Sequence, residues 1–471
     1  MIKALRNYFS KDYSWIPLET PPHTTLQLAG KLLLKHELPF SEKEITSLVD
    51  QSALTTIPSI EKHVWGYRCR RCGNQKRDYF AEMPHSSCQK KCIYCRSCIQ
   101  MGRVIECEPL YYGSPQVEWP HYHEPCSWEG TLTVHQRRAS HELKQLIQKG
   151  NGEKLIWAVC GAGKTEMLFP GITEALITGK RLCLATPRTD VVRELLPRFR
   201  QAFPDVKIAG LYGTSEDKKG DASFVIATTH QLYRFARAFD LIIIDEIDAF
   251  PFHNDPSLHY AAARAAKENA ALIYLTATPR KTQKKRIRSK SLPAVFIPKR
   301  FHGYPLPVPQ FKLTPALHRH LKRSKLPGSI LERIRHQQNS YRQLLIFLPT
   351  KQQAEKISSY LKSFSLHVAY VHAEDPLRAE KVSAFRAKEY DILVTTTILE
   401  RGVTFPSVDV YVMDAGHDVF DEPALVQISG RAGRSPDDPR GDVFFFHIGK
   451  TNAMLDAKDA IIEMNRLGAN S

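Results

Sequence analysis

The sequence predicts an α/β protein in which two parallel-sheet lobes follow a small cysteine-rich module. Three observations support this fold class. Short apolar runs alternate with helical patterns after residue 131, a basic segment divides these runs into two sets, and seven of the ten cysteines lie between Cys69 and Cys107. Buried parallel strands appear as continuous apolar runs, because helices cover both faces of such a sheet.

Ten apolar runs are candidate strands of the two sheets. The first set comprises Leu155–Val159, Leu182–Thr186, Phe224–Thr229, Leu241–Asp245 and Leu272–Ala277. The second set comprises Leu344–Leu348, Val368–Val371, Ile392–Thr396, Val408–Met413 and Val443–Phe446. A chain of 471 residues is too long for one compact core. We expect an N-terminal region of uncertain fold (1–60), a four-cysteine module with its connector (61–130), a first lobe (131–300) and a second lobe (301–471).

The region before residue 131 carries weaker signals. Helical periodicity is visible from Leu26 to Leu34, and the Pro- and aromatic-rich stretch from Pro109 to Trp128 indicates an irregular connector. The first residues, Met1 to Phe9, lack the apolar run of a secretory signal, and no run approaches the ~20 apolar residues that span a bilayer. We therefore expect a cytoplasmic protein without a transmembrane segment of its own.

The positive charge of the chain is concentrated in one segment. The formal net charge is +17, and the stretch from Arg280 to Arg342 contains seventeen Lys or Arg and one acid, Glu332. Concentrated positive charge attracts polyanions, because neutralising phosphates releases condensed counterions. The alternative is a solvated linker that charge keeps soluble. Its predicted position between two lobes favours a role in nucleic-acid binding.

The segment from Ala158 to Thr165 reads AVCGAGKT and overlaps the end of a strand candidate. It fits the phosphate-loop pattern, with Ala158 where the first glycine usually stands. Backbone N–H groups of a small-residue loop that opens onto a helix cradle phosphate oxygens. Lys164 is expected to reach the β- and γ-phosphates of ATP, and Thr165 to hold Mg²⁺. The remaining cradle residues are Gly161, Ala162 and Gly163.

Two further segments complete the expected ATPase chemistry. The apolar run before Asp245 ends in carboxylates, of which Asp245 is expected to bind Mg²⁺ and Glu246 to polarise the attacking water. The segment QISGRAGR lies far along the chain, and guanidinium groups supplied across a cleft stabilise the charge that develops on the transferred phosphoryl group. From this segment we select Gln427, Arg431 and Arg434.

The clustered cysteines indicate a zinc site. Two CxxC pairs separated by 22 residues can supply four thiolates to a tetrahedral Zn²⁺: Cys69, Cys72, Cys95 and Cys98. Cys88 and Cys92 add candidates, and a different ligand set stays open. Four arginines lie beside the two CxxC pairs: Arg68, Arg70, Arg71 and Arg96. They are compatible with DNA contact and equally with a purely structural zinc site.

From residue 131 to the C-terminus, the order of motifs resembles that of superfamily 2 helicases. The segment that ends at Gln136 resembles the glutamine motif that reads adenine, and Gly402 lies in a segment that resembles motif V and completes the nucleotide set. Asp245 to Asp248 resembles motif II, and Thr276 to Thr278 resembles motif III. The resemblance implies two RecA-like lobes. It also places six residues of motifs Ia, Ib and V against DNA: Pro187, Arg188, Thr229, His230, Thr396 and Thr397.

A closer resemblance is to the late-competence DNA-uptake ATPases (the ComFA family) of Gram-positive bacteria. It rests on the phrases AVCGAGKTEMLFPGI, ATPRTDVV, IIIDEIDAFP and TTTILERGVT, together with an upstream YCRSC. The family implies an ATPase that single-stranded DNA drives, at the inner face of the membrane beside the transformation channel. It also implies a phosphoribosyltransferase-like competence protein as a partner, and it places the second zinc pair in YCRSC.

The leading hypothesis is an ATP-driven motor that moves along single-stranded DNA and powers the import of transforming DNA, with ATP, Mg²⁺ and Zn²⁺ as its cofactors. Two alternatives stay open. One is a duplex-unwinding helicase of the replication-restart type. The other is a nucleotide-gated DNA-binding adaptor, which would show little stimulation of hydrolysis by DNA. The sequence indicates neither polarity nor oligomeric state.

Overall fold

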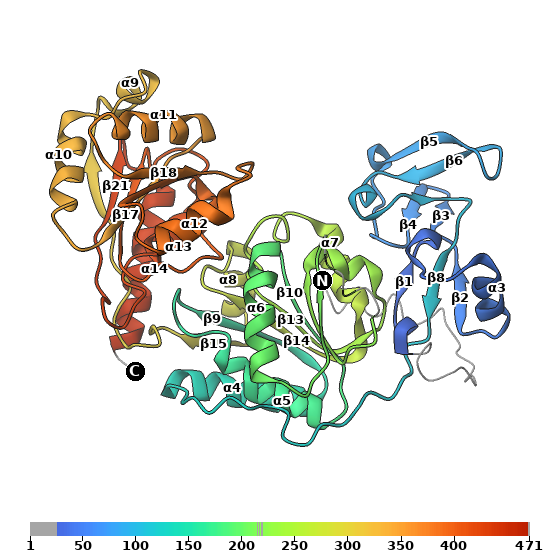
Figure 1. Ribbon diagram of the computed structural model, residues 1–471. Coiled ribbons are helices and arrows are strands. Elements are labelled where there is room, and N and C mark those ends of the chain that lie inside the picture. The colour runs from blue at the N-terminus through green and yellow to red at the C-terminus, as the bar shows by residue number, and fades with distance from the viewer. Residues whose placement is uncertain (1–25, 214, 216, 218–219, 470–471) are drawn as a thin grey trace.

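The computed structural model describes residues 26–469 except 214, 216, 218 and 219. Two parallel-sheet lobes are preceded by a region of small antiparallel sheets, and these three parts follow one another along the chain (Figure 1). The expectation for Met1 to Phe9 lies outside the described residues. Within the described part of the chain, no helix is both long and apolar enough to cross a membrane.

The first lobe is built on a seven-stranded sheet in which all neighbouring strands are parallel. In spatial order its strands are β11 (Ile208–Leu211), β12 (Phe224–Thr228), β10 (Leu182–Thr186), β13 (Phe239–Ile244), β14 (Ala266–Thr276), β9 (Gly152–Ala158) and β15 (Ala294–Ile297). The central strands β10, β12 and β13 are almost wholly buried, which is why they read as continuous apolar runs.

Helices cover both faces of this sheet. They are α4 (Val134–Lys149), η4 (Glu166–Leu168), α5 (Phe169–Ile177), α6 (Thr189–Ala202), η5 (Thr229–Arg234), α7 (Pro256–Ala265) and α8 (Lys281–Arg288). The helix α4 begins with a capping box, in which Thr133 and Gln136 satisfy each other's backbone N–H groups. The helix α6 buries Val192, Leu195 and Phe199 on one face, as its helical periodicity requires.

The second lobe is a six-stranded parallel sheet. Its strands in order are β16 (Gln310–Leu313), β21 (Val443–His447), β20 (Val408–Met413), β17 (Gln343–Phe347), β19 (Ile392–Thr395) and β18 (Val368–Val371). Its helices are α9 (Leu317–Lys322), α10 (Gly328–Gln337), α11 (Lys351–Lys362), α12 (Arg378–Arg386), η6 (Thr397–Leu399), α13 (Glu422–Ser429) and α14 (Asn452–Ala469). The two parallel sheets confirm the predicted fold class.

All ten predicted strands are present, and the three further strands of the two parallel sheets, which sequence reasoning missed, share one property. The strands β11, β15 and β16 each lie at the edge of a sheet and each has four residues. An edge strand pairs on one side only and tolerates polar residues, so its apolar run is short or interrupted, as in the sequence QFKL of β16.

The interpretation of the basic segment as a linker is wrong. Residues 280–342 form α8 and β15 of the first lobe and β16, α9 and α10 of the second. Only residues 298–309 pass between the two sheets without regular structure. Apolar side chains such as Val295, Leu317 and Ile330 are buried and anchor this segment. One of its charged side chains is buried as well, since Arg300 is 1% exposed and donates to the Ala432 carbonyl of the second lobe at 2.9 Å.

The N-terminal region contains two small groups of strands. The first group is a sheet of β1 (Leu32–Leu33), β8 (Leu110–Gly113) and β2 (Leu54–Ile57), accompanied by η1 (Lys35–Glu37) and α3 (Glu42–Asp50). The second group holds the cysteines on β3 (Ile60–His63), β4 (Gly66–Cys69), η2 (Arg77–Tyr79), β5 (Phe80–His85), β6 (Lys90–Cys95), η3 (Ile99–Met101) and β7 (Val104–Ile105).

Two expectations for this region are wrong in part. The stretch from Leu26 to Leu34 is helical only at residues 26–28, after which the chain turns and forms β1. The connector from Pro109 to Trp128 is irregular from residue 114 onward, but its start forms β8 between β1 and β2. Both errors have the same cause, because β1 and β8 become strands by pairing with segments that are distant in the sequence: β1 pairs with β8, and β8 also pairs with β2.

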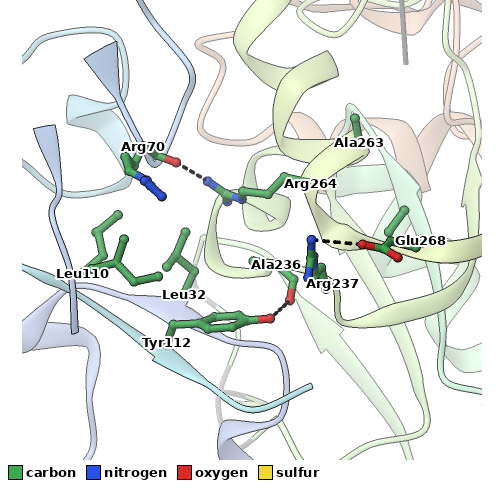
Figure 2. Close-up of a pocket in the computed structure, with 11 residues that line it drawn as sticks. Leu32, Arg70, Leu110, Tyr112, Ala236, Arg237, Ala263, Arg264 and Glu268 are labelled. Carbon is green, nitrogen blue, oxygen red and sulfur yellow. Dashed lines mark hydrogen bonds and ion pairs between the residues drawn. The ribbon is translucent and has the colours of Figure 1, made fainter. Parts of the chain in front are cut away.

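The N-terminal region is packed firmly against the first lobe. Figure 2 shows the contact: Arg264 donates from Nη1 to the carbonyl oxygen of Arg70 at 3.1 Å, and the hydroxyl of Tyr112 donates to that of Ala236 at 3.2 Å. Beside them Arg237 forms an ion pair with Glu268 at 3.1 Å. Because Arg264 is almost fully buried and bonds backbone carbonyls on both sides, the two parts are held as one body.

Candidate nucleotide site and zinc module

The phosphate loop leaves β9 and leads into η4 and α5. Gly161 and Gly163 have positive φ angles of 79° and 66°, which a residue with a Cβ rarely adopts. The Gln136 amide donates to the carbonyl oxygens of Ala162 at 2.8 Å and Gly163 at 3.0 Å. A Cβ on Gly163 would lie 2.4 Å from that amide nitrogen. Gln136 therefore supports the loop directly and holds its backbone open for an anion.

The predicted acids follow β13 and face the phosphate loop. Lys164 Nζ lies 3.7 Å from an oxygen of Asp245, whose carboxylate also accepts the Glu246 N–H at 2.9 Å. Burial disfavours the charge of Lys164, but Asp245 and Glu246 outweigh it and raise its pKa. With nucleotide bound, Lys164 would pair with the phosphate oxygens and Asp245 would face the Mg²⁺ ion.

Glu246 is buried, and this burial raises its pKa above the ordinary range for a glutamate. Asp245 raises the pKa further, whereas the Arg401 guanidinium, 4.0 Å away, lowers it. An elevated pKa suits a group that takes a proton from water during hydrolysis. One oxygen of Glu246 has no hydrogen-bond partner within the described chain and is available for such a water.

The raised pKa of Glu246 predicts a pH dependence of turnover. Hydrolysis requires the deprotonated carboxylate of Glu246, so kcat should fall as the pH is lowered. The midpoint of this fall should lie at a higher pH than an exposed glutamate would give. The substitution Arg401→Gln removes a cation that lowers this pKa, so the fall should move to still higher pH. Measuring kcat at saturating ATP from about pH 5 to about pH 9 checks this. A midpoint that stays in place or moves to lower pH would contradict the assigned role of Glu246.

The second lobe reaches the phosphate loop through the end of α13. Gln427 accepts a hydrogen bond from the Cys160 thiol at 3.0 Å, and a Cβ on Gly430 would lie 2.5 Å from the Cys160 Cβ. Arg431 is 1% exposed and donates from Nε to the Glu400 carbonyl at 3.0 Å, but its Nη1 has no partner in the described chain. A buried guanidinium with a free donor is a site for an anion.

The two lobes enclose a cleft of about 500 Å³ between the phosphate loop and α13. All the residues predicted to bind nucleotide or to catalyse its hydrolysis line it: Gln136, Gly161, Ala162, Gly163, Lys164, Thr165, Asp245, Glu246, Gly402, Gln427, Arg431 and Arg434. The glycine cradle, the lysine and the unpartnered arginine donor fit a nucleoside triphosphate, and Asp245 with Thr165 supplies the oxygen ligands that Mg²⁺ prefers.

A buried ion pair between Asp248 and Arg401 joins the lobes beside this cleft. Both side chains are at most 2% exposed. Asp248 also accepts hydrogen bonds from the hydroxyls of Thr276 and Thr278, each at 2.5 Å. Although burial opposes it, Arg401 holds the pKa of Asp248 at about 2. The predicted site residues omitted this pair, although both members stand in the motif II and motif V segments.

The residues predicted to contact DNA differ in how exposed they are. Arg188 and the pair Thr396 and Thr397 are half-buried, and Arg188 donates to the Ile398 carbonyl of the other lobe at 2.9 Å. Pro187 and Thr229 are buried, and Thr229 is 0% exposed, so its side chain offers no surface to a strand of DNA. These residues lie at the carboxyl ends of β10, β12 and β19, where parallel strands of a sheet meet a ligand.

His230 lies in a groove of about 960 Å³ between the zinc module and the first lobe. Arg68, Lys76 and Arg96 line the module side of this groove. Phe250 lines the opposite side with 73% of its surface exposed. Tyr79 is a second exposed aromatic side chain of the lining. A groove with basic side chains and exposed aromatic rings has the features of a surface for single-stranded nucleic acid.

The four predicted zinc ligands converge in the module. The sulfur atoms of Cys72 and Cys95 lie 3.6 Å apart and those of Cys69 and Cys98 lie 3.9 Å apart, and all four residues are at most 1% exposed. Zinc–sulfur bonds of about 2.3 Å in a tetrahedron place sulfurs about 3.8 Å apart. This geometry fits Zn²⁺. Cys88 and Cys92 lie elsewhere in the module and do not join the cluster.

Two of the arginines beside the zinc-binding cysteines form ion pairs that stabilise the fold. Arg71 is fully buried and its guanidinium pairs with Glu37 at 2.8 Å, while Glu37 also accepts from Arg234 of the first lobe at 2.8 Å. Arg70 pairs with Glu61 at 2.5 Å. The suggestion that Arg71 contacts DNA is therefore wrong, and the glutamate that neutralises it could not be located from sequence spacing.

The fold and the cleft define a superfamily 2, helicase-like ATPase. Comparison with protein families agrees: residues 129–281 match the type III restriction enzyme res subunit, residues 326–436 the helicase conserved C-terminal domain, and residues 20–112 the competence protein ComFA N-terminal domain. The competence protein ComFA of Bacillus subtilis (strain 168) is 45% identical over 442 residues, which are 94% of this chain and 95% of that protein. The chain belongs to the competence protein ComFA family.

A second relative and a solved structure extend the comparison. The competence protein ComFA of Streptococcus pneumoniae is 37% identical over 443 residues, which cover 94% of this chain and 98% of that protein. Among solved structures, Dbp5 of S. cerevisiae bound to RNA and ADP BeF3 aligns with a TM-score of 0.51 at 15% identity, over 71% of this chain and 91% of that one. This last likeness shows the fold alone.

Proposed function

We propose that this protein is an ATP-driven motor that moves along single-stranded DNA and powers the import of transforming DNA. The observation that carries the proposal is the cleft between the lobes, in which one lobe supplies the phosphate loop and acids and the other supplies Arg431 and Arg434. Hydrolysis then requires lobe closure, and closure couples the chemistry to movement of the lobes along a bound strand.

The DNA path is expected to use two surfaces. Arg188, Thr396 and Thr397 stand at the carboxyl ends of strands in both lobes, where they would hold the sugar–phosphate backbone without reading bases. His230 and Phe250 face the basic side of the zinc module across the groove, where bases would stack on the exposed ring. Zn²⁺ bound by the four buried cysteines would keep that side of the groove rigid.

The proposed cellular location and partners are those that the family resemblance implies. In this proposal the protein is cytoplasmic and associates peripherally with the inner face of the membrane, beside the DNA-uptake channel. A phosphoribosyltransferase-like competence protein is an expected partner. The close packing of the N-terminal region on the first lobe supports a stable scaffold for such contacts.

The test is ATP hydrolysis by the purified protein without DNA, with single-stranded DNA and with duplex DNA. Single strands are expected to raise turnover by about tenfold or more, because a bound strand favours lobe closure. The blank is Lys164→Ala, which should lower turnover by at least about 100-fold in all three conditions, since the γ-phosphate loses its charged contact. Equal turnover with and without DNA would contradict a DNA motor and favour the adaptor.

A strand-separation assay on a forked duplex distinguishes the second alternative. The proposed translocase is expected to hydrolyse ATP on single strands without separating the fork. Efficient, ATP-dependent separation would favour the duplex-unwinding helicase instead. The variant Phe250→Ala is informative in both assays, because loss of stacking should weaken single-strand binding by about 1–3 kcal/mol without altering the cleft.

A further inference from the structure

We propose that the module binds a second zinc ion, held by His85, Cys88, Cys92 and Cys107. Three of these residues, His85, Cys88 and Cys107, place one ligand atom each within 4.8 Å of one another. The fourth is adjacent, since the sulfur atoms of Cys88 and Cys92 lie 3.2 Å apart. None of the four belongs to the Cys69 cluster, so this is a separate site.

The distances suit a tetrahedral ion. The Cys107 sulfur lies 3.2 Å from Nδ1 of His85, which matches the Cys88–Cys92 separation. Zn–S bonds of about 2.3 Å and Zn–N bonds of about 2.0 Å need ligand separations of about 3.5–3.8 Å. Seating the ion requires the two close pairs to open by about half an ångström. It also requires the Cys92 sulfur, which lies more than 4.8 Å from at least one of the other three ligand atoms, to move closer. A set of three thiols and one imidazole selects zinc among common metals.

The environment of His85 is that of a metal ligand. Its Nδ1 faces Cys107, and its other ring nitrogen, Nε2, lies 3.5 Å from a carboxylate oxygen of Glu108. Histidines that bind zinc usually donate their second N–H to a carboxylate, which sets the tautomer and orients the ring. The side chain of His85 is 11% exposed, so this orientation is also restrained by packing.

The fold explains why the four residues meet although their spacing gives no simple motif. His85 ends β5, Cys92 lies on the paired strand β6, and Cys88 lies in the turn that connects them. Cys107 follows β7, which pairs with β6 on its other side. The two proposed ions therefore lie at opposite ends of β6, which carries Cys92 for one and Cys95 for the other. The second ion would tie the β5–β6 turn to the segment after β7.

The experiment measures the zinc and iron content of the purified protein by elemental mass spectrometry. The protein concentration is determined by amino-acid analysis, so that the result is a number of metal ions per chain. Two zinc ions per chain are expected, and the double variant Cys88→Ser/Cys107→Ser should retain one. The matched control, Cys126→Ser, removes a cysteine outside both clusters and should retain two. One zinc per wild-type chain, an unchanged content in the double variant, or iron in place of zinc would overturn the proposal.

X-ray absorption at the zinc edge gives an independent check that does not depend on the double variant folding. Wild-type protein should show seven sulfurs and one nitrogen for two ions, an average of 3.5 sulfurs and 0.5 nitrogen per zinc. The variant His85→Cys should keep two zinc ions and lose the nitrogen contribution. An all-sulfur spectrum in the wild type would exclude His85 as a ligand and overturn the site.

Discussion

The substitution Arg431→Ala is expected to lower ATP turnover by about 10³- to 10⁵-fold while ATP still binds. Arg431 lies at the end of α13, is 1% exposed, and directs an unpartnered Nη1 toward the cleft. Burial lowers its pKa, and a bound triphosphate would relieve the cost of that buried charge. Because the charge on the phosphoryl group grows during transfer, the loss should fall on kcat rather than on nucleotide affinity.

Steady-state hydrolysis and binding of a fluorescent ATP analogue together check this result. Arg431→Lys keeps a positive charge but loses the planar fork, so it should recover only part of the activity. The matched control is Arg335→Ala, because Arg335 is an exposed arginine on α10 of the same lobe and does not line the cleft. Turnover close to that of the control would show that Arg431 does not act on the transferred phosphate.

The second large effect is expected at the ion pair between the lobes. Asp248→Ala removes the nearest of the three carboxylates around the buried Arg401 guanidinium, the others being those of Glu400 and Glu246, at a cost of about 3–5 kcal/mol. Since the pair joins the lobes, opening them to solvate Arg401 avoids this cost. The closed form should therefore lose population by roughly 10²- to 10⁴-fold, and hydrolysis should fall with it. Small-angle scattering should show a larger radius of gyration.

The double variant Asp248→Ala/Arg401→Met tests the cause of that opening. Removing both charges leaves neither member of this pair buried without the other, so the scattering profile should return toward the wild type even though hydrolysis stays low. The control is Glu422→Gln, which breaks the more exposed pair between Lys284 and Glu422 and should cost at most about 1 kcal/mol. A closed profile for Asp248→Ala would show that other contacts hold the lobes together.

Most of the fold could be predicted from the sequence because its signals are local. The central strands of both sheets are buried on both faces and read as apolar runs. The edge strands β11, β15 and β16 have only four residues each, and polar residues interrupt the run of β16. The helical expectation after Leu26 was wrong in part because β1 is a strand only through its pairing with the distant β8. The positive charge of residues 280–342 was evident from the sequence. The buried apolar residues that pack this segment into the two lobes were not recognised, because they are scattered among basic residues.

The candidate site also has parts that the local sequence predicts and parts that depend on contacts between distant residues. The sequence alone determined the phosphate loop, the acids after β13 and the two CxxC pairs, because in each the chemistry lies within a few consecutive residues. Only the tertiary structure decided that Arg401 pairs with Asp248, that Glu37 neutralises Arg71, and that Cys107 meets His85. These partners are 153, 34 and 22 residues apart. At such separations a contact depends on how whole sheets and hairpins pack, and no local pattern encodes it.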